Sequence, residues 1–136
     1  MAAPTPVTKT FWDGTRGMTR WYAAWADATA LTDSVVVDVS ALAPEPNAIK
    51  VRSIDIWLNG DLQVDLEFDA TTDELLDRFI GQTDVTNWGY RDYTDGPNAG
   101  FAPDQTAAGF VKDLLLTTTG QALGDEVSLL IVYERS

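Results

Sequence analysis

The acidic side chains are the residues of this chain with the clearest chemical potential. Asp65 and Glu67 stand two positions apart in QVDLEF, which places both carboxylates on one strand face, about 7 Å apart. Glycoside hydrolysis needs two acids about 5 to 10 Å apart across a cleft. A solvated strand face carries polar side chains at the same spacing for no catalytic reason. We therefore rank a hydrolase that uses carboxylates alone last among the possible functions.

The segment RDYTDGPNAG offers oxygen ligands for calcium through Asp92, Asp95 and Asn98. Its spacing does not fit an EF-hand loop, and Asp-Gly and Gly-Pro are ordinary turn sequences. The glycine pairs at 14/17 and 120/124 lack the lysine of a phosphate-binding loop. We expect no metal site and no cofactor.

Two residue types that carry much of enzyme chemistry are missing from the sequence. The chain has no cysteine and no histidine. Disulfides, zinc–thiolate sites, cysteine nucleophiles, Ser–His–Asp triads and histidine metal ligands are therefore excluded. Because no set of catalytic residues remains, we expect that the protein is not an enzyme.

The aromatic residues favour a binding surface. Trp57 alternates with the aliphatic residues of its segment, so it is expected to point outward beside Asp55. An outward tryptophan on a sheet suggests either a subunit interface or a platform for stacking sugars. Trp88, Tyr90 and Tyr93 pose the same choice. We favour an interface, because no convergent cluster of polar groups accompanies these rings.

The charge balance excludes two classes of partner. The chain has 21 acidic and nine basic residues, for a net charge of −12 and a pI near 4.1. Duplex nucleic acids and anionic membranes both attract basic proteins, so we expect no nucleic-acid and no membrane partner. Neither a secretory signal nor a run of 18 apolar residues is recognisable. We expect assembly in a cytoplasm.

Residues 1–20 differ in composition from the remaining chain. They hold three of the nine basic residues but only one acid, and they open with the proline-containing MAAPTPVTKT. This pattern predicts an extended arm that contacts another subunit, with the adjacent aromatics as anchors. The residues expected to bind a partner are Pro4, Pro6, Lys9, Phe11, Trp12, Arg16 and Arg20 in the arm, and Trp57, Trp88, Tyr90 and Tyr93 beyond it.

Residues 21–136 read as one all-β domain. In residues 54–68, apolar residues alternate with polar ones on both sides of Asn59-Gly60, which predicts a β-hairpin with a two-residue turn. Further strands are expected at 20–26, 34–39 and 111–118, and a strand buried on both faces at 126–134. These elements predict an antiparallel β-sandwich or jelly-roll-like domain.

Two segments are harder to interpret. Thr71 and Glu74 resemble a capping box, and the spacing of Leu75, Leu76, Phe79 and Ile80 is helical, which favours a short helix or turn over an irregular strand. Residues 83–108 are rich in glycine, proline and aromatic residues. They are expected to form a long loop that serves as an interaction surface.

The turn sequences of residues 34–136 resemble those of a family of small β-rich proteins of tailed phages. The matching positions are Asp69-Ala70-Thr71, Thr118-Thr119-Gly120, Gly124-Asp125 and a last strand that ends at Arg135. The resemblance implies a structural virion component of the capsid decoration, or cement, type. Its implied partners are the major capsid protein and further copies of itself, as a homotrimer on the outside of the capsid. The alternative is a carbohydrate-binding module displayed on a virion or cell surface.

Overall fold

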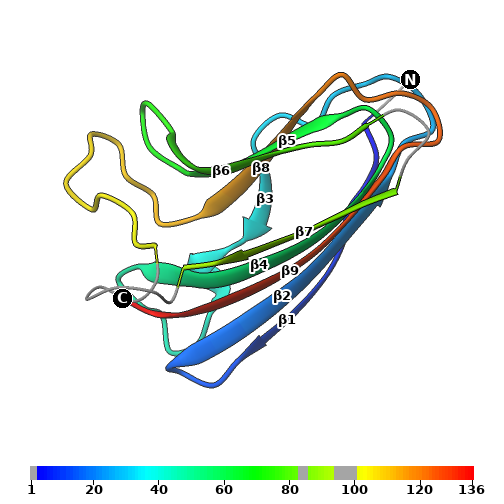
Figure 1. Ribbon diagram of the computed structural model, residues 1–136. Coiled ribbons are helices and arrows are strands. Elements are labelled where there is room, and N and C mark those ends of the chain that lie inside the picture. The colour runs from blue at the N-terminus through cyan, green and yellow to red at the C-terminus, as the bar shows by residue number, and fades with distance from the viewer. Residues whose placement is uncertain (1–2, 83–85, 94–100) are drawn as a thin grey trace.

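The chain folds into two antiparallel β-sheets that pack face to face (Figure 1). We describe a computed structural model, in which residues 3–82, 86–93 and 101–136 are placed. One sheet has five strands in the order β1-β2-β9-β4-β7, and the other has four in the order β3-β8-β5-β6. This arrangement confirms the predicted all-β fold and fits a β-sandwich, whereas the jelly-roll form is not confirmed. The strands are β1 (Val7–Trp12), β2 (Arg16–Ala24), β3 (Ser34–Val37), β4 (Ile49–Asn59), β5 (Gln63–Phe68), β6 (Glu74–Ile80), β7 (Thr86–Asp92), β8 (Leu114–Thr119) and β9 (Glu126–Arg135).

The core lies between the sheets and follows from the two-residue period of the strands. In β4 the aliphatic residues Ile54, Ile56 and Leu58 are buried, and in β5 every second residue from Val64 to Phe68 is buried. The central strand β9 adds Val127, Leu129, Ile131 and Tyr133. Within the described part of the chain, the helical structure is one 3₁₀ turn, Val39–Ala41, so no helix is long and apolar enough to cross a membrane.

The predicted hairpin at Asn59-Gly60 is wrong, although both of its strands exist. β4 pairs with β7 and β9 in one sheet, whereas β5 pairs with β6 and β8 in the other. The turn after Asn59 therefore carries the chain across the core from sheet to sheet. Strands with inward aliphatic faces satisfy either arrangement, because their alternation fixes which face is buried and leaves the pairing partner open.

The helix-like segment at 71–81 is a strand. Residues Glu74 to Ile80 form β6, which pairs with β5 and carries a register irregularity between Leu66 and Glu67 of that partner. Leu75 pairs with Glu67 and Asp77 with Leu66, so Leu76 is an extra residue at a bulge. Because of the bulge, both Leu76 and Phe79 are buried, although they are three positions apart. Buried residues at this spacing are typical of a helix, which explains the wrong prediction.

The loop predicted for residues 83–108 contains a strand as well. β7 occupies Thr86–Asp92 at one edge of the five-stranded sheet. On the inner face of β7, position 89 is a glycine. An aliphatic residue there would have completed the alternation that predicts a strand, so the sequence pattern did not reveal β7. A Cβ at Gly89 would lie 3.0 Å from Cγ2 of Ile56, so the close approach of these strands favours a residue without a side chain there.

Two further expectations are corrected at the edge and the centre of the five-stranded sheet. The extended arm over residues 1–20 is not confirmed, because Val7–Trp12 pairs with Gly17–Tyr22 of β2 within this sheet. The threonine-rich alternation of VTKTFW suits an edge strand. The 126–134 strand is central, as predicted, but only one of its faces is fully buried; Ser128 on the other face is exposed.

Candidate functional site

The outer face of the five-stranded sheet is the main candidate site. Directly paired residues of antiparallel strands lie on the same face of a sheet, so the strand register assigns each side chain to a side. One cross-strand row on the outer face is Val7, Tyr22, Ser128, Trp57 and Trp88, from β1, β2, β9, β4 and β7. The next row is Lys9, Arg20, Leu130, Asp55 and Tyr90, and the third is Phe11, Met18, Val132, Ser53 and Asp92. We call these fifteen residues the exposed sheet face.

This face gathers most of the exposed apolar side chains that the structure describes. Twelve large hydrophobic residues are exposed in the described part of the chain. Seven of them lie on the exposed sheet face, and the most exposed are Val7 at 69%, Phe11 at 62% and Trp88 at 60%. Single exposed apolar residues are ordinary on a protein surface, whereas a contiguous group marks a surface that binds something. The seven residues are Val7, Phe11, Met18, Tyr22, Trp57, Trp88 and Tyr90.

The aromatic residues on β4 and β7 have a defined local geometry. The rings of Trp88 and Tyr90 stack with centroids 6.4 Å apart and planes 19° apart. The indole N–H of Trp88 donates a hydrogen bond to the carboxylate of Asp55. A shallow hollow of about 340 Å³ lies on the same sheet, and Tyr22, Trp57 and Ser128 are among the residues that line it. The Trp88 ring is therefore held in place by Tyr90 and Asp55.

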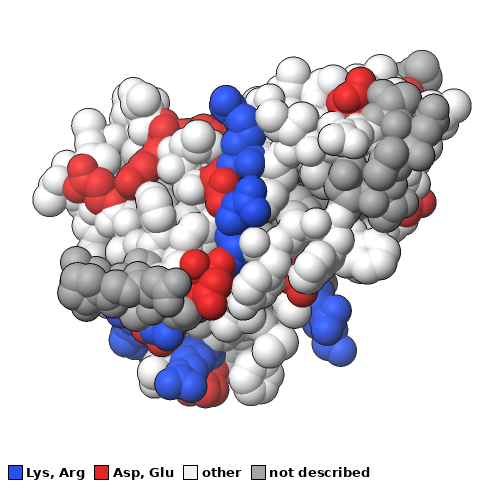
Figure 2. All heavy atoms as spheres, in the orientation of Figure 1, with Lys and Arg blue, Asp and Glu red and all other residues white. Residues whose placement is uncertain are grey.

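Charge is distributed unevenly across the exposed sheet face. Lys9 and Arg20 lie on β1 and β2 at one side, and Asp55 and Asp92 lie on β4 and β7 at the other. The face is therefore bipolar. One half carries an exposed lysine and an exposed arginine, and the other half carries two carboxylates. On the side of the molecule seen in Figure 2, basic side chains form a narrow row with acidic side chains beside it, rather than a broad basic patch.

An ion-pair cluster closes one end of this face. Glu134 on β9 contacts Lys50 Nζ at 3.2 Å and Arg52 Nη1 at 2.9 Å. Desolvation by burial raises the pKa of the Glu134 carboxyl, but the hydrogen bonds and charges of Lys50 and Arg52 outweigh it and leave the pKa below its ordinary value. Arg16 pairs with Glu134 in the strand register. The two ion pairs link β4 to β9.

The structure brings together seven of the residues predicted to bind a partner. Lys9, Phe11, Arg20, Trp57, Trp88 and Tyr90 belong to the exposed sheet face, and Arg16 lies on the same side at its end. Trp57 points outward with Asp55, as the alternation predicts. Sequence reasoning missed Val7, Met18 and Tyr22. The alternation in RGMTRWYAA, where Gly17, Thr19 and Trp21 are buried, is the signal that could have found the last two.

The four remaining predicted residues lie elsewhere. Trp12 turns inward, stacks on Tyr133 with centroids 6.0 Å apart, and donates its indole N–H to the Pro44 carbonyl at 3.0 Å. Tyr93 is half-buried, contacts the Phe101 ring and donates its hydroxyl hydrogen to Asp77. Pro4 and Pro6 precede β1 and are half-buried. The contacts of Trp12 and Tyr93 are thus with residues of their own chain.

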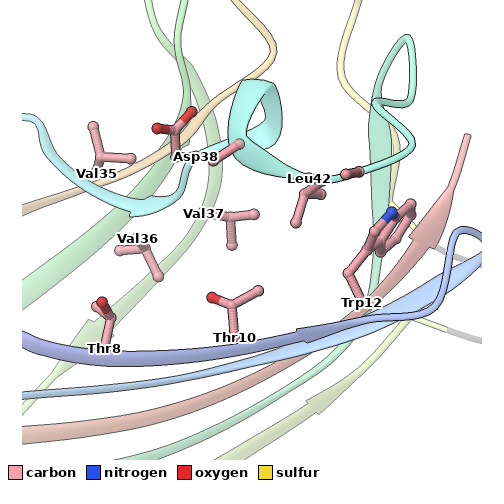
Figure 3. Close-up of a pocket in the computed structure, with 10 residues that line it drawn as sticks. Thr8, Thr10, Trp12, Val35, Val36, Val37, Asp38 and Leu42 are labelled. Atoms are coloured by element: carbon pink, nitrogen blue, oxygen red, sulfur yellow. The ribbon is translucent and has the colours of Figure 1, made fainter.

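A groove opens on one side of the sandwich, between the edge strands β1 and β3 (Figure 3). Its volume is about 400 Å³. Val36, Val37 and Leu42 line it from one side, and the hydroxyls of Thr8 and Thr10 line it from β1. Asp38 is the one titratable residue in this lining. The groove can accept an apolar group, but it holds no pair of acid and base.

The carboxylates on the four-stranded sheet do not form the predicted acid pair. Asp65 accepts two hydrogen bonds from Arg78, at 2.7 and 3.0 Å, so its charge is compensated. Glu67 instead lies with Asp33 and Asp73, with carboxylate oxygens within 4.8 Å of one another. Desolvation, followed by the charges of Asp73 and Asp65, raises the pKa of Glu67. Such oxygens suit calcium, but an acidic cluster alone is no evidence of a bound ion.

The predicted calcium loop is only partly described by the structure. Asp92 ends β7, whereas Asp95 and Asn98 lie outside the described residues.

The comparisons with known proteins are sparse. No family model matches the chain, and no curated protein matches it. A solved structure of Bacillus endospore appendages, which form a family of disulfide-linked pili, aligns over 99% of this chain and 93% of its own. Its TM-score is 0.38 and its sequence identity 15%, and the present chain has no cysteine. A similarity of this size carries no conclusion about function.

Proposed function

We propose that the protein is a non-enzymatic structural protein of a virion, a capsid decoration protein that binds the outside of a phage head. Its partners would be the major capsid protein and further copies of the same chain. The mechanism would be mechanical: bridging neighbouring capsomers, burying apolar area and adding polar contacts at the rim. The turn sequences of residues 34–136 support the phage assignment, and the exposed sheet face supports a role in permanent assembly.

The observation that carries this proposal is the seven-residue apolar group on the exposed sheet face. Five strands about 4.8 Å apart and about nine residues long give the face a flat extent of about 20 by 30 Å. The resulting area of about 600 Å² approaches the roughly 800 Å² that each partner contributes to a standard protein interface. The aromatic content matches interface cores, where tyrosine, tryptophan and methionine are enriched.

Co-sedimentation with purified phage heads tests the proposal. The full chain should bind heads that lack the protein, and the Trp57→Ser/Trp88→Ser variant should bind at least about tenfold more weakly, because truncation of central aromatic anchors usually costs 2 kcal/mol or more. Leu123→Ser is the matched control, because Leu123 is 74% exposed in the turn before β9, away from this face. A wild-type chain that does not sediment with heads would refute the decoration role.

A carbohydrate-binding module is the second candidate, and the near-parallel stack of Trp88 and Tyr90 favours it. Sugars bind to flat aromatic platforms through their apolar ring faces, and the hollow between Tyr22 and Trp57 lies on the same surface. Titration calorimetry against a panel of soluble oligosaccharides separates the candidates. Saturable binding that Trp88→Ala abolishes would favour the carbohydrate function over the capsid one.

A further inference from the structure

We infer that the exposed sheet face binds a second copy of this chain, about a two-fold axis that runs parallel to the strands along β9. The inference rests on the proposed function only because both treat this face as a protein interface. It goes further by naming a second copy of the chain as the partner. It differs from the trimer that the phage resemblance implies.

The strand order makes the face self-complementary under this rotation. When two copies face each other across such an axis, β9 lies on β9, β2 on the partner's β4, and β1 on the partner's β7. Within one row, Tyr22 meets the partner's Trp57, and Val7 meets the partner's Trp88. Ser128 at the centre of this row meets its own copy, as Leu130 does in the next row. Aromatic and aliphatic side chains therefore oppose one another along the row, as in an interface core.

The charges select this axis over the alternative. In the middle row the rotation places Arg20 opposite the partner's Asp55, and it does so twice because the interface is symmetric. Lys9 meets the partner's Tyr90, whose ring can accept a cation. A two-fold axis across the strands would instead place β1 on β1 and β2 on β2, with Lys9 near Lys9 and Arg20 near Arg20. Like charges in such contact disfavour association, so the axis along β9 is preferred.

Size and shape agree with a pair of sheets. The flat extent of about 600 Å² on each copy is close to what a standard interface needs, and aligned packing of two sheets tolerates a rotation of about 30° between them. The groove between β1 and β3, with the proline segment before β1, lies at the side of the sandwich and stays accessible in such a dimer. The dimer occupies the same face that we propose for phage heads, so a chain that binds a head through this face must first leave the dimer.

Charge reversal tests the pairing. Light scattering coupled to gel filtration should give the full chain, at about 100 µM, twice its 14.8 kDa mass. Arg20→Asp creates two Asp–Asp contacts per dimer and Asp55→Arg creates two Arg–Arg contacts, so each single variant should dissociate at least about tenfold more readily. An equimolar mixture of the two variants should recover a heterodimer, and the Arg20→Asp/Asp55→Arg double variant should recover a homodimer, because both restore opposite charges.

The controls separate this inference from the proposed function. Asp61→Arg makes the same charge change in the exposed turn between β4 and β5, and it should leave the dimer intact. Circular dichroism and urea unfolding establish that each variant folds. A monomeric wild-type chain, a trimer, or a dimer that both reversals leave unchanged would overturn the inference. The co-sedimentation result with phage heads is measured independently, so it decides the decoration role whatever the oligomeric state.

Discussion

Gly60 and the carboxylate of Asp125 meet at the point where the chain crosses from one sheet to the other. A Cβ built on Gly60 would lie 2.0 Å from Oδ1 of Asp125. Asp125 is 9% exposed, and its other carboxylate oxygen accepts a hydrogen bond from the Ala122 N–H at 2.8 Å. Gly60 has a φ of +120°, a backbone conformation that favours glycine. The crossing between the sheets thus depends on the absence of a side chain at this position.

We expect Gly60→Ala to lower the free energy of unfolding by about 2 to 4 kcal/mol, through backbone strain and displacement of the Asp125 carboxylate. Gly124→Ala is the matched control. Gly124 also has a positive φ, +91°, but a Cβ there would have no atom within 4 Å, so only the strain applies. Urea unfolding of both variants measures the difference. Equal losses would show that the contact with Asp125 contributes nothing.

The same crossing shows what the sequence could and could not predict. Alternation in residues 54–68 correctly predicted two strands and their buried faces, because burial follows the period of the strand. The turn residues could not decide between a hairpin and a crossing, because Asn-Gly serves any turn that needs a positive φ. The bulge at Leu76 hid β6 for a related reason: it depends on pairing with β5, which no local pattern records.

The candidate site was predictable residue by residue but not as a surface. The outward direction of Trp57 follows from its own strand. Its place beside Trp88 and in one row with Tyr22 depends on the strand order β1-β2-β9-β4-β7, which joins segments far apart in the sequence. The predicted arm is not confirmed for a similar reason, because residues 7–12 pair with β2 of the same chain.

A chain of hydroxyls, buried at Thr19 and Tyr133, links three strands of the five-stranded sheet. Thr19 Oγ1 lies 3.0 Å from Thr10 Oγ1 and 2.9 Å from the Tyr133 hydroxyl. Thr19→Val keeps the shape but removes this partner of the buried phenol, so we expect a loss of about 1 to 3 kcal/mol in the free energy of unfolding. Tyr133→Phe leaves the Thr10–Thr19 bond in place and should cost about 1 kcal/mol.

A double-mutant cycle of these two substitutions measures their coupling. The Thr19→Val/Tyr133→Phe variant should lose less stability than the sum of the single losses, because it leaves no phenol to satisfy. Strictly additive losses in urea unfolding would show that the Thr19–Tyr133 hydrogen bond does not contribute to stability.

Acid should weaken the fold through Glu134. Because Lys50 and Arg52 keep the pKa of Glu134 below its ordinary value of 4.5, this carboxylate stabilises the folded state above that pH. The contribution is lost as the pH falls below 4.5 and through the lower pKa of the folded state. Glu134→Gln removes the titrating group. Between pH 6 and pH 3 its free energy of unfolding should therefore decline less steeply than that of the wild type, whereas parallel curves would contradict this role.

Alkali should act through Tyr93, which follows the last residue of β7. Asp77 on β6 accepts the hydroxyl hydrogen of Tyr93 and contacts Arg91 Nε of β7 at 3.3 Å, so these three residues connect the two sheets. Burial, followed by the hydrogen bond and charge of Asp77, raises the pKa of Tyr93 above its ordinary value of 10.0. The folded state therefore holds the phenol proton where the unfolded state releases it. Its stabilising contribution is complete below pH 10 and declines as the pH rises towards the higher pKa of the folded state.

Tyr93→Phe removes the titrating hydroxyl that this decline requires. Its melting temperature should fall less between pH 8 and pH 11 than that of the wild type, while at neutral pH it should be about 1 kcal/mol less stable, since Asp77 loses a donor. Tyr22→Phe is the control, because Tyr22 is 41% exposed on the outer sheet face. Asp77→Asn keeps an acceptor for the phenol but removes the negative charge, so the tyrosinate absorbance near 295 nm should develop at a lower pH than in the wild type. An unchanged absorbance titration in Asp77→Asn would show that the negative charge of Asp77 does not help to hold the proton on Tyr93.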